Sequence, residues 1–377
     1  MISSIIRMRK EVIMKGYTIS NNPYTLRFSY IPPRMIERTV IMDEIIGNFV
    51  RDIPTYSGMF ITGVRGAGKT VMLSEIRKRM GAGKDWITVD LNPESDLLDS
   101  LARRLFIIPE LKRLFLEARL DFSVLGIGIH LENAELIASN EEDAVLMMLR
   151  ALKKAGKKLF VTIDEVTYSK KVARFSHALS SYSSEGYDIY VLMTGLIENI
   201  NNIRNKKSLT FLYRAKVKEL DILNITLIRN DYQDALGLPF DLAEQIARES
   251  RGYSLAFQAI GHLYYDEICR CDSYDKIDQN KIDNELDQIL SELSYDKIWS
   301  ELSDNDRAVL KAMSKIKDLT GKEYIKIEQI RNTTGMSSDS FTKYRSRLLE
   351  RGIVDGSQYG HLRFKLPRFE QYISREG

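Results

Sequence analysis

The segment Gly63–Thr70 constrains this chain most, because it reads glycine, four residues, glycine, lysine and threonine without substitution. A loop that wraps a triphosphate aims successive backbone N–H groups inward, and glycine permits the φ values that this requires. Lys69 would place its cation on the β- and γ-phosphates, and Thr70 would offer a hydroxyl to Mg²⁺. The residues expected to contact a nucleotide here are Gly63, Val64, Arg65, Gly66, Ala67, Gly68, Lys69, Thr70 and Val71.

The flanks of this segment have the periodicity that such a loop needs. Gly58–Thr62 is a short apolar run and is predicted to be a buried strand. Val71–Met80 places its apolar residues on one helical face and ends with basic residues, which is typical of an amphipathic helix. The positive N-terminal end of that helix would point at the bound anion.

A second strand ends in two carboxylates. Lys157–Glu165 is apolar on both faces, which predicts a central strand of a parallel sheet. Asp164 could hold Mg²⁺ through water, since Mg²⁺ keeps several waters and takes few protein oxygens. Glu165 could orient and polarise the attacking water. The alternative is a strand that merely ends in solvated acids at a turn.

Two further residues are candidates for catalysis. Thr194 ends the buried strand Asp188–Gly195 and could reach the γ-phosphate or the attacking water, or it could simply cap the strand. Arg214 precedes the last predicted strand and could stabilise transition-state charge in its own or a neighbouring subunit. Arg204 is a second candidate for this role, and a surface position is the alternative for both arginines.

The order of strands and helices predicts an α/β fold with a doubly wound parallel sheet. Ligands of such sheets lie beyond the carboxyl ends of the strands, so we expect the triphosphate where two neighbouring strands end. Residues 120–131 alternate around glycines and predict a small inserted hairpin. The predicted domains are a basic N-terminal linker (1–40), an ATPase core (41–222), a helical lid (223–300) that could close over the nucleotide, and a C-terminal domain (301–377).

Composition limits the class of protein. The chain has 377 residues, of which 44% are hydrophobic and 28% charged, which predicts a soluble globular protein with two or three domains. No apolar run is long enough to span a membrane, and residues 1–10 do not resemble a secretory signal. Cys269 and Cys271 lie too close in sequence for an unstrained disulfide, so we expect a cytoplasmic protein.

The C-terminal domain carries a second functional signal. Three predicted helices and a two-stranded hairpin follow one another from Asp304 to Leu366, which is the order of a winged helix. The third helix would present basic and hydroxyl side chains suited to DNA phosphates. The net charge is +8 over residues 1–220, −9 over 221–300 and +4 over 301–377. The candidate DNA contacts are Thr342, Lys343, Arg345, Ser346, Arg347 and Arg363.

Together these motifs resemble P-loop ATPases of the AAA+ and STAND groups, close to archaeal-type ATPases similar to origin-recognition initiators. The resemblance rests on Gly63–Thr70, Leu159–Glu165, the strand ending at Thr194 and the winged-helix pattern. It implies an ASCE-type core with ATP and Mg²⁺. It also implies an adenine contact from Pro33 and Arg38, although Glu37 stands where relatives usually carry glycine. Tyr253, in the lid motif Gly252-Tyr253-Ser254, would touch the nucleotide or pack in the core.

We therefore expect a slowly hydrolysing ATP switch that binds DNA through its winged helix. One alternative is a STAND-like signalling switch whose winged helix contacts a partner protein. Another is a transposition or phage-defence accessory ATPase that binds DNA without sequence preference. Self-association is open in each case. An acid-capped face around Lys343, Arg345, Arg347 and Arg363 would favour the signalling switch.

Overall fold

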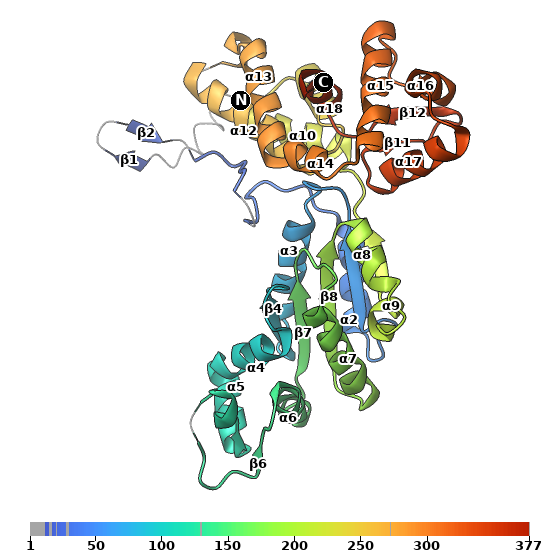
Figure 1. The fold of residues 1–377 in the computed structure, drawn as a ribbon. Coiled ribbons are helices and arrows are strands. Elements are labelled where there is room, and N and C mark those ends of the chain that lie inside the picture. Colours follow the sequence, from blue (N-terminus) through green and yellow to red (C-terminus); the bar gives the residue numbers. More distant parts are fainter. Residues whose placement is uncertain are drawn as a thin grey trace. The chain divides into compact units, whose positions relative to one another are not determined.

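The structure is a computed structural model that describes residues 12–14, 17–19, 21–27, 30–128, 130–271 and 273–376. Contacts divide the chain, whose fold is drawn in Figure 1, into two compact units. The core unit comprises Thr39–Thr62 and Lys69–Leu220, and the lid unit comprises Met1–Arg38, Gly63–Gly68 and Asp221–Gly377. The N-terminal stretch 1–10, for which no secretory signal is predicted, lies outside the described residues.

A parallel sheet forms the centre of the core unit. Its strands are β3 (Gly58–Thr62), β4 (Trp86–Leu91), β7 (Lys158–Ile163), β8 (Ile189–Gly195) and β9 (Lys216–Glu219). They pair in the order β4-β7-β8-β3-β9. The prediction that a triphosphate lies where two neighbouring strands end stays a prediction. β8 lies between β3, which precedes the glycine loop, and β7, which precedes Asp164, because β8 pairs with both.

Helices cover both faces of this sheet. Alternate residues of β7 point to opposite sides, so Leu159 and Val161 lie in one hydrophobic cluster and Phe160 in another. α2 and α3 supply the cluster around Phe160, and α4 to α9 supply the other, which is the predicted doubly wound arrangement. The helices are α2 (Thr39–Val50), α3 (Lys69–Gly81), α4 (Leu97–Ile107), α5 (Pro109–Glu117), α6 (Glu141–Lys154), α7 (Lys170–Ser184), α8 (Ile197–Arg204) and α9 (Thr210–Arg214).

The predicted hairpin at 120–131 is wrong. β5 (Leu120–Asp121) pairs in parallel with β6 (Leu136–Ile137), and a 3-10 turn, η1 (Ser123–Leu125), follows β5. The buried Asp121 carboxylate builds this connection by accepting hydrogen bonds from the backbone N–H groups of Ser123 and Leu131. Hydrogen bonds from these two residues hold the pKa of Asp121 well below its usual range.

The lid unit is mostly helical. Its elements are β1 (Val12–Met14), β2 (Tyr17–Ile19), α10 (Ile225–Leu236), α11 (Phe240–Glu249), α12 (Ser254–Cys271), η2 (Tyr274–Lys276), α13 (Gln279–Leu290), a π-helical turn η3 (Ser291–Tyr295), α14 (Asp296–Ser300), α15 (Asp304–Thr320), β10 (Ile325–Lys326), α16 (Ile327–Thr334), α17 (Ser338–Glu350), β11 (Val354–Asp355), β12 (His361–Phe364) and α18 (Phe369–Glu376). One hydrophobic cluster runs through α10–α13 and α15–α18, so the predicted lid and C-terminal domain share a core.

Tyr24 and Ile36, from the predicted N-terminal linker, are part of that core. Tyr24 is buried, and its hydroxyl donates a hydrogen bond of 2.6 Å to Asp231 on α10. A Cβ on Gly261 of α12 would lie 2.5 Å from the Tyr24 ring, so only glycine allows this packing. Sequence periodicity did not reveal this contact because Tyr24 and Gly261 are far apart along the chain.

The C-terminal segment has the predicted order of three helices and a two-stranded hairpin. α15, α16 and α17 precede β11 and β12, which pair antiparallel. Ser337 caps α17 by accepting a hydrogen bond from the N–H of Ser340. Two elements were not predicted: β10, which pairs with β12 to complete a three-stranded sheet, and α18.

Among the described helices, none combines the length and apolar character that a bilayer crossing requires.

Candidate nucleotide-binding site

The glycine loop has the backbone conformation that its sequence predicts. Gly66 and Gly68 adopt φ values of 78° and 91°, in the region that side chains disfavour. The N–H of Ala67 donates to the carbonyl of Val64 at 3.1 Å, which makes a turn inside the loop. The loop belongs to the lid unit, and the chain continues at Lys69 into α3 of the core unit.

The first turn of α12 holds this loop from its carbonyl side. The Tyr253 hydroxyl donates to the carbonyl of Arg65 at 2.6 Å, and the Ser254 hydroxyl donates to that of Ala67 at 2.9 Å. The N–H of Leu255 donates to the carbonyl of the intervening Gly66 at 3.2 Å. Three successive loop carbonyls are thus bound by three successive residues of the lid.

Tyr253 was predicted to touch the nucleotide or to pack in the core, and the structure shows it packed in the core of the lid unit. Its side chain is buried, and its hydroxyl lies between the Arg65 carbonyl and Ser294 Oγ, 2.8 Å away. Burial raises the pKa of Tyr253, so the hydroxyl keeps its proton. A Cβ on Gly66 would lie 2.1 Å from this hydroxyl. Glycine is therefore needed at this position both for its φ value and to avoid a clash with Tyr253.

Arg38 also lies beside the loop. Its guanidinium donates to the Asp221 carbonyl at 2.9 Å and to Ser254 Oγ at 3.1 Å, and it approaches the Cβ position of Gly68 at 3.5 Å. Burial lowers the pKa of Arg38 to about 10, so the side chain is still cationic at neutral pH. Pro33, the other predicted adenine contact, is exposed and makes no hydrogen bond with the described residues.

Two further residues of the predicted motif have defined surroundings. Arg65 pairs with Glu301 at 3.6 Å within the lid unit. Lys69 is buried in the first turn of α3, where Val71 is partly buried.

In the core unit, polar side chains meet at the carboxyl end of the sheet. The Thr70 hydroxyl donates to Asp164 Oδ2 at 2.7 Å. The hydroxyl of the fully buried Thr194 donates to Asp164 Oδ1 and accepts the N–H of Glu165 at 3.0 Å. Glu165 itself is exposed and has a φ of 51°, a conformation that is costly without glycine and is frequent at functional sites. Thr70, Asp164 and Thr194 therefore meet within this unit.

The contact of Thr194 with the γ-phosphate or the attacking water stays a prediction. A threonine hydroxyl has one proton, and Thr194 donates it to Asp164. Thr194 therefore contacts the carboxylate of Asp164 and the backbone of Glu165.

Arg214 lies at the other end of the sheet. β9 begins at Lys216 opposite Met59 and ends at Glu219 opposite Thr62, so Arg214 precedes the amino ends of both strands. At about 3.3 Å per residue, it is at least about 10 Å along the strands from their carboxyl ends. Arg214 therefore does not reach the site of its own chain, and the neighbouring-subunit role and a plain surface position stay open. Arg204 instead donates to the carbonyl of Tyr213.

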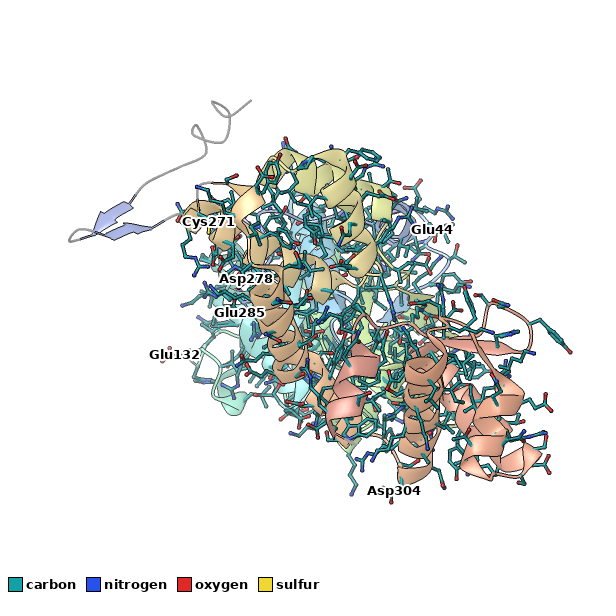
Figure 2. All side chains as sticks on the ribbon, turned by 90° about the horizontal axis from the view of Figure 1, so that it is seen from above. Glu44, Glu132, Cys271, Asp278, Glu285 and Asp304 are labelled. Atoms are coloured by element: carbon teal, nitrogen blue, oxygen red, sulfur yellow. The ribbon has the colours of Figure 1, made fainter. Side chains whose placement is uncertain are left out.

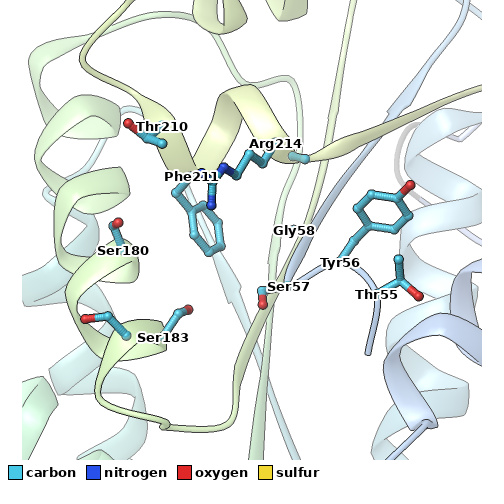
Figure 3. Close-up of a pocket in the computed structure, with 11 residues that line it drawn as sticks. Thr55, Tyr56, Ser57, Gly58, Ser180, Ser183, Thr210, Phe211 and Arg214 are labelled. Carbon is cyan, nitrogen blue, oxygen red and sulfur yellow. The ribbon is translucent and has the colours of Figure 1, made fainter. Parts of the chain in front are cut away.

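Arg214 lines a cavity of about 600 Å³ with Phe211 and several hydroxyl side chains (Figure 3). The lining residues are Thr55, Tyr56, Ser57, Gly58, Ser180, Ser183, Ser184, Thr210, Phe211, Arg214 and Ala215.

The predicted DNA-binding residues do not form a uniformly free basic face. Arg347 donates to Asp306 Oδ1 at 3.0 Å, and Arg363 donates to Asp355 Oδ2 at 2.7 Å. Arg345 is partly buried. The exposed candidates are Thr342, Lys343 and Ser346.

Sequence reasoning did not give Ser254 a role and left Arg251 uncertain. Arg251 has a φ of 49° and donates to the carbonyls of Phe364 and Leu366 at 2.9 Å, which ties the start of α12 to the C-terminal segment. The sequence could have indicated both residues, because they lie in the short run Arg251–Ser254 that links two predicted helices. Cys271 (labelled in Figure 2) and Cys269 are free thiols, and no metal-binding cluster occurs among the described residues.

Comparisons with known proteins agree with the fold. A family profile described as a domain of unknown function, DUF8462, matches residues 293–373, and a comparison with curated proteins finds no similar sequence. The Walker-type ATPase PABY2304 of Pyrococcus abyssi has a TM-score of 0.58 at 12% identity, over 90% of this chain and 96% of that one. The ORC2 protein of Aeropyrum pernix, solved with ADPNP and ADP, has a TM-score of 0.58 at 15% identity, over 93% and 96%.

The chain thus shares the fold of a Walker-type ATPase and of an ORC2 protein, which agrees with the resemblance that its motifs predicted. At these identities the likeness concerns the fold alone.

Proposed function

We propose that this protein is an ATP-binding switch that hydrolyses ATP slowly. The observation that carries the proposal is the hydrogen bond of 2.7 Å between Thr70, the last residue of a complete phosphate-loop sequence, and Asp164. These are the two side chains that the motifs assign to Mg²⁺. The Aeropyrum protein was solved with ADPNP and ADP, which supports an adenine nucleotide as the ligand.

The donor set fits Mg²⁺. The ion prefers oxygen ligands and keeps several waters, and Thr70 and Asp164 offer a hydroxyl and a carboxylate. Neither Asp164 nor Glu165 pairs with a basic side chain among the described residues. When bound, Mg²⁺ would neutralise charge on the phosphates, while Thr70 and Asp164 would hold it.

Glu165 is the base in this proposal. Its backbone N–H is fixed by Thr194, and its exposed carboxylate follows the strand that positions Asp164. It would accept a proton from the attacking water while Lys69 stabilises the phosphate charge. Arg214 could act only on the nucleotide of a neighbouring copy, which would make turnover depend on self-association.

The C-terminal segment is the proposed output of the switch, as a winged helix. Arg251 donates to a carbonyl of this segment, and Tyr253, two residues further on, binds the phosphate loop. A conformational change of the loop would therefore be transmitted to the C-terminal segment. Exposed Lys343 supports contact with DNA phosphates. The ion pairs of Arg347 and Arg363 favour the second candidate, a switch whose winged helix contacts a partner protein.

The test is an equilibrium titration of the full chain with ATP and Mg²⁺. Lys69→Ala should abolish binding, because the cation that meets the phosphates is lost. Lys78→Ala is the matched control, since Lys78 is an exposed lysine in the last turn of the same helix. Equal affinities of Lys69→Ala and wild type would refute the proposed site.

A further inference from the structure

The phosphate loop is held on one side only. Its carbonyls at Arg65, Gly66 and Ala67 accept hydrogen bonds from the start of α12. Among the described residues, none accepts a hydrogen bond from the N–H of Gly66 or Gly68.

Peptide geometry connects these two facts. A trans peptide is planar, so its carbonyl and the N–H of the next residue point in opposite directions. When Tyr253 fixes the Arg65 carbonyl, it turns the N–H of Gly66 to the opposite side of the loop. Ser254 does the same for the N–H of Gly68 through the Ala67 carbonyl. A carbonyl that accepts a hydrogen bond also makes the N–H of its own peptide a better donor.

The direction of the Ser254 hydrogen bond is itself set by a neighbour. Arg38 can only donate, so Ser254 Oγ accepts from Arg38 and must give its own proton to Ala67. The same guanidinium lies beside Gly68 and adds positive charge to the loop.

We propose that Tyr253 and Ser254 are positioning residues of the phosphate site. From the lid they hold the loop carbonyls outward, so that the N–H groups of Gly66 and Gly68 are preset for a phosphate group. The inference rests on the proposed nucleotide function and adds a regulatory consequence. A displacement of α12 would release these peptides and weaken phosphate binding.

The experiment measures binding of ADP and of adenosine to the full chain by calorimetry. Tyr253→Phe and Ser254→Ala remove one hydroxyl each. Each should weaken ADP binding about fivefold, and the double variant about twentyfold, from the value of one hydrogen bond apiece. Adenosine binding should not change, because only the phosphate contacts are affected. Ser254→Thr keeps a hydroxyl and should restore ADP binding.

Tyr264→Phe is the control, since it removes a buried tyrosine hydroxyl from the same helix, where it contacts Gln279. It should leave ADP affinity unchanged. Two results would overturn the inference: a double variant that binds ADP as wild type does, or equal losses for ADP and adenosine, which mean general loosening. If Lys69→Ala abolishes ADP binding while the double variant keeps it, only this inference fails. If wild type binds no ADP, the proposed function fails with it.

Discussion

The acidic end of the core sheet and the basic face of α17 were both predicted as binding sites, and they differ in what their charges meet. Asp164 and Glu165 have hydroxyl and amide partners and no basic partner among the described residues. On the C-terminal segment, Arg347 and Arg363 each meet a carboxylate. An unneutralised acid suits a cation, whereas a neutralised arginine has little charge left for a polyanion. The two surfaces thus differ mainly in whether their charged side chains already have partners of opposite charge.

The largest effect is expected at the acidic end. Glu165→Gln should lower ATP turnover about 100-fold or more while ATP still binds, because the amide cannot accept the proton of the attacking water. Steady-state ATPase assays beside binding titrations would measure this. Glu132→Gln, an exposed position in the core unit (Figure 2), is the control. Wild-type turnover in Glu165→Gln would reject Glu165 as the base.

The second prediction concerns the basic face. Arg347→Ala should lower the free energy of unfolding by about 2 kcal/mol, because it leaves the buried Asp306 without its cation. The loss is smaller than for a fully buried pair, since Arg347 is partly exposed to solvent. Lys343→Ala should change stability little and should lower the salt dependence of any DNA binding. Chemical denaturation and DNA titrations would measure both. If Arg347→Ala and Lys343→Ala both changed the free energy of unfolding by the same small amount, the ion pair of Arg347 with Asp306 would not contribute to stability.

Thr194→Val should have a smaller effect on the acidic end. The valine keeps the shape but loses the hydrogen bonds to Asp164 and Glu165, so Mg²⁺-dependent turnover should fall about tenfold. Thr194→Ser should recover most of the activity. Turnover of Thr194→Val that matches wild type would mean that the acids need no such support.

The smallest effect is a pH dependence in the lid unit. Burial alone would raise the pKa of Glu370, but Arg251 and Lys317 outweigh burial and lower it. A lowered pKa in the folded state stabilises the protein above the unfolded value of about 4.3, and this contribution is lost as pH falls through the folded value. Thermal unfolding between neutral and acid pH should therefore show a shallower acid-side decline in Glu370→Gln. Identical pH profiles would contradict the assignment.

Much of the nucleotide motif could be predicted because its signals are local. Gly63–Thr70 and the strand before Asp164 are contiguous patterns whose chemistry follows from residue type and spacing. The sheet order could not be predicted in the same way. The insertion of β8 between β3 and β7 depends on which strands pair, and chain order does not encode that.

The errors concern contacts between distant parts of the sequence. Helical periodicity correctly places Arg347 toward the surface, but the carboxylate that binds it comes from α15, 41 residues away. Tyr253 could be assigned to the nucleotide or to the core from its motif, and only the packed lid shows that its hydroxyl binds the Arg65 carbonyl. Arg214 precedes a strand, as predicted, but at the amino end of the sheet.

The central proposition is that Thr70 and Asp164 bind the Mg²⁺ of a nucleotide held by the glycine loop. The most direct measurement is calorimetric titration of the full chain with ATP, with Mg²⁺ and with a chelator, for wild type and Asp164→Asn. We expect single-site binding that Mg²⁺ tightens in wild type and does not tighten in Asp164→Asn. Absence of ATP binding by the wild type, or the same Mg²⁺ effect in both proteins, would contradict it.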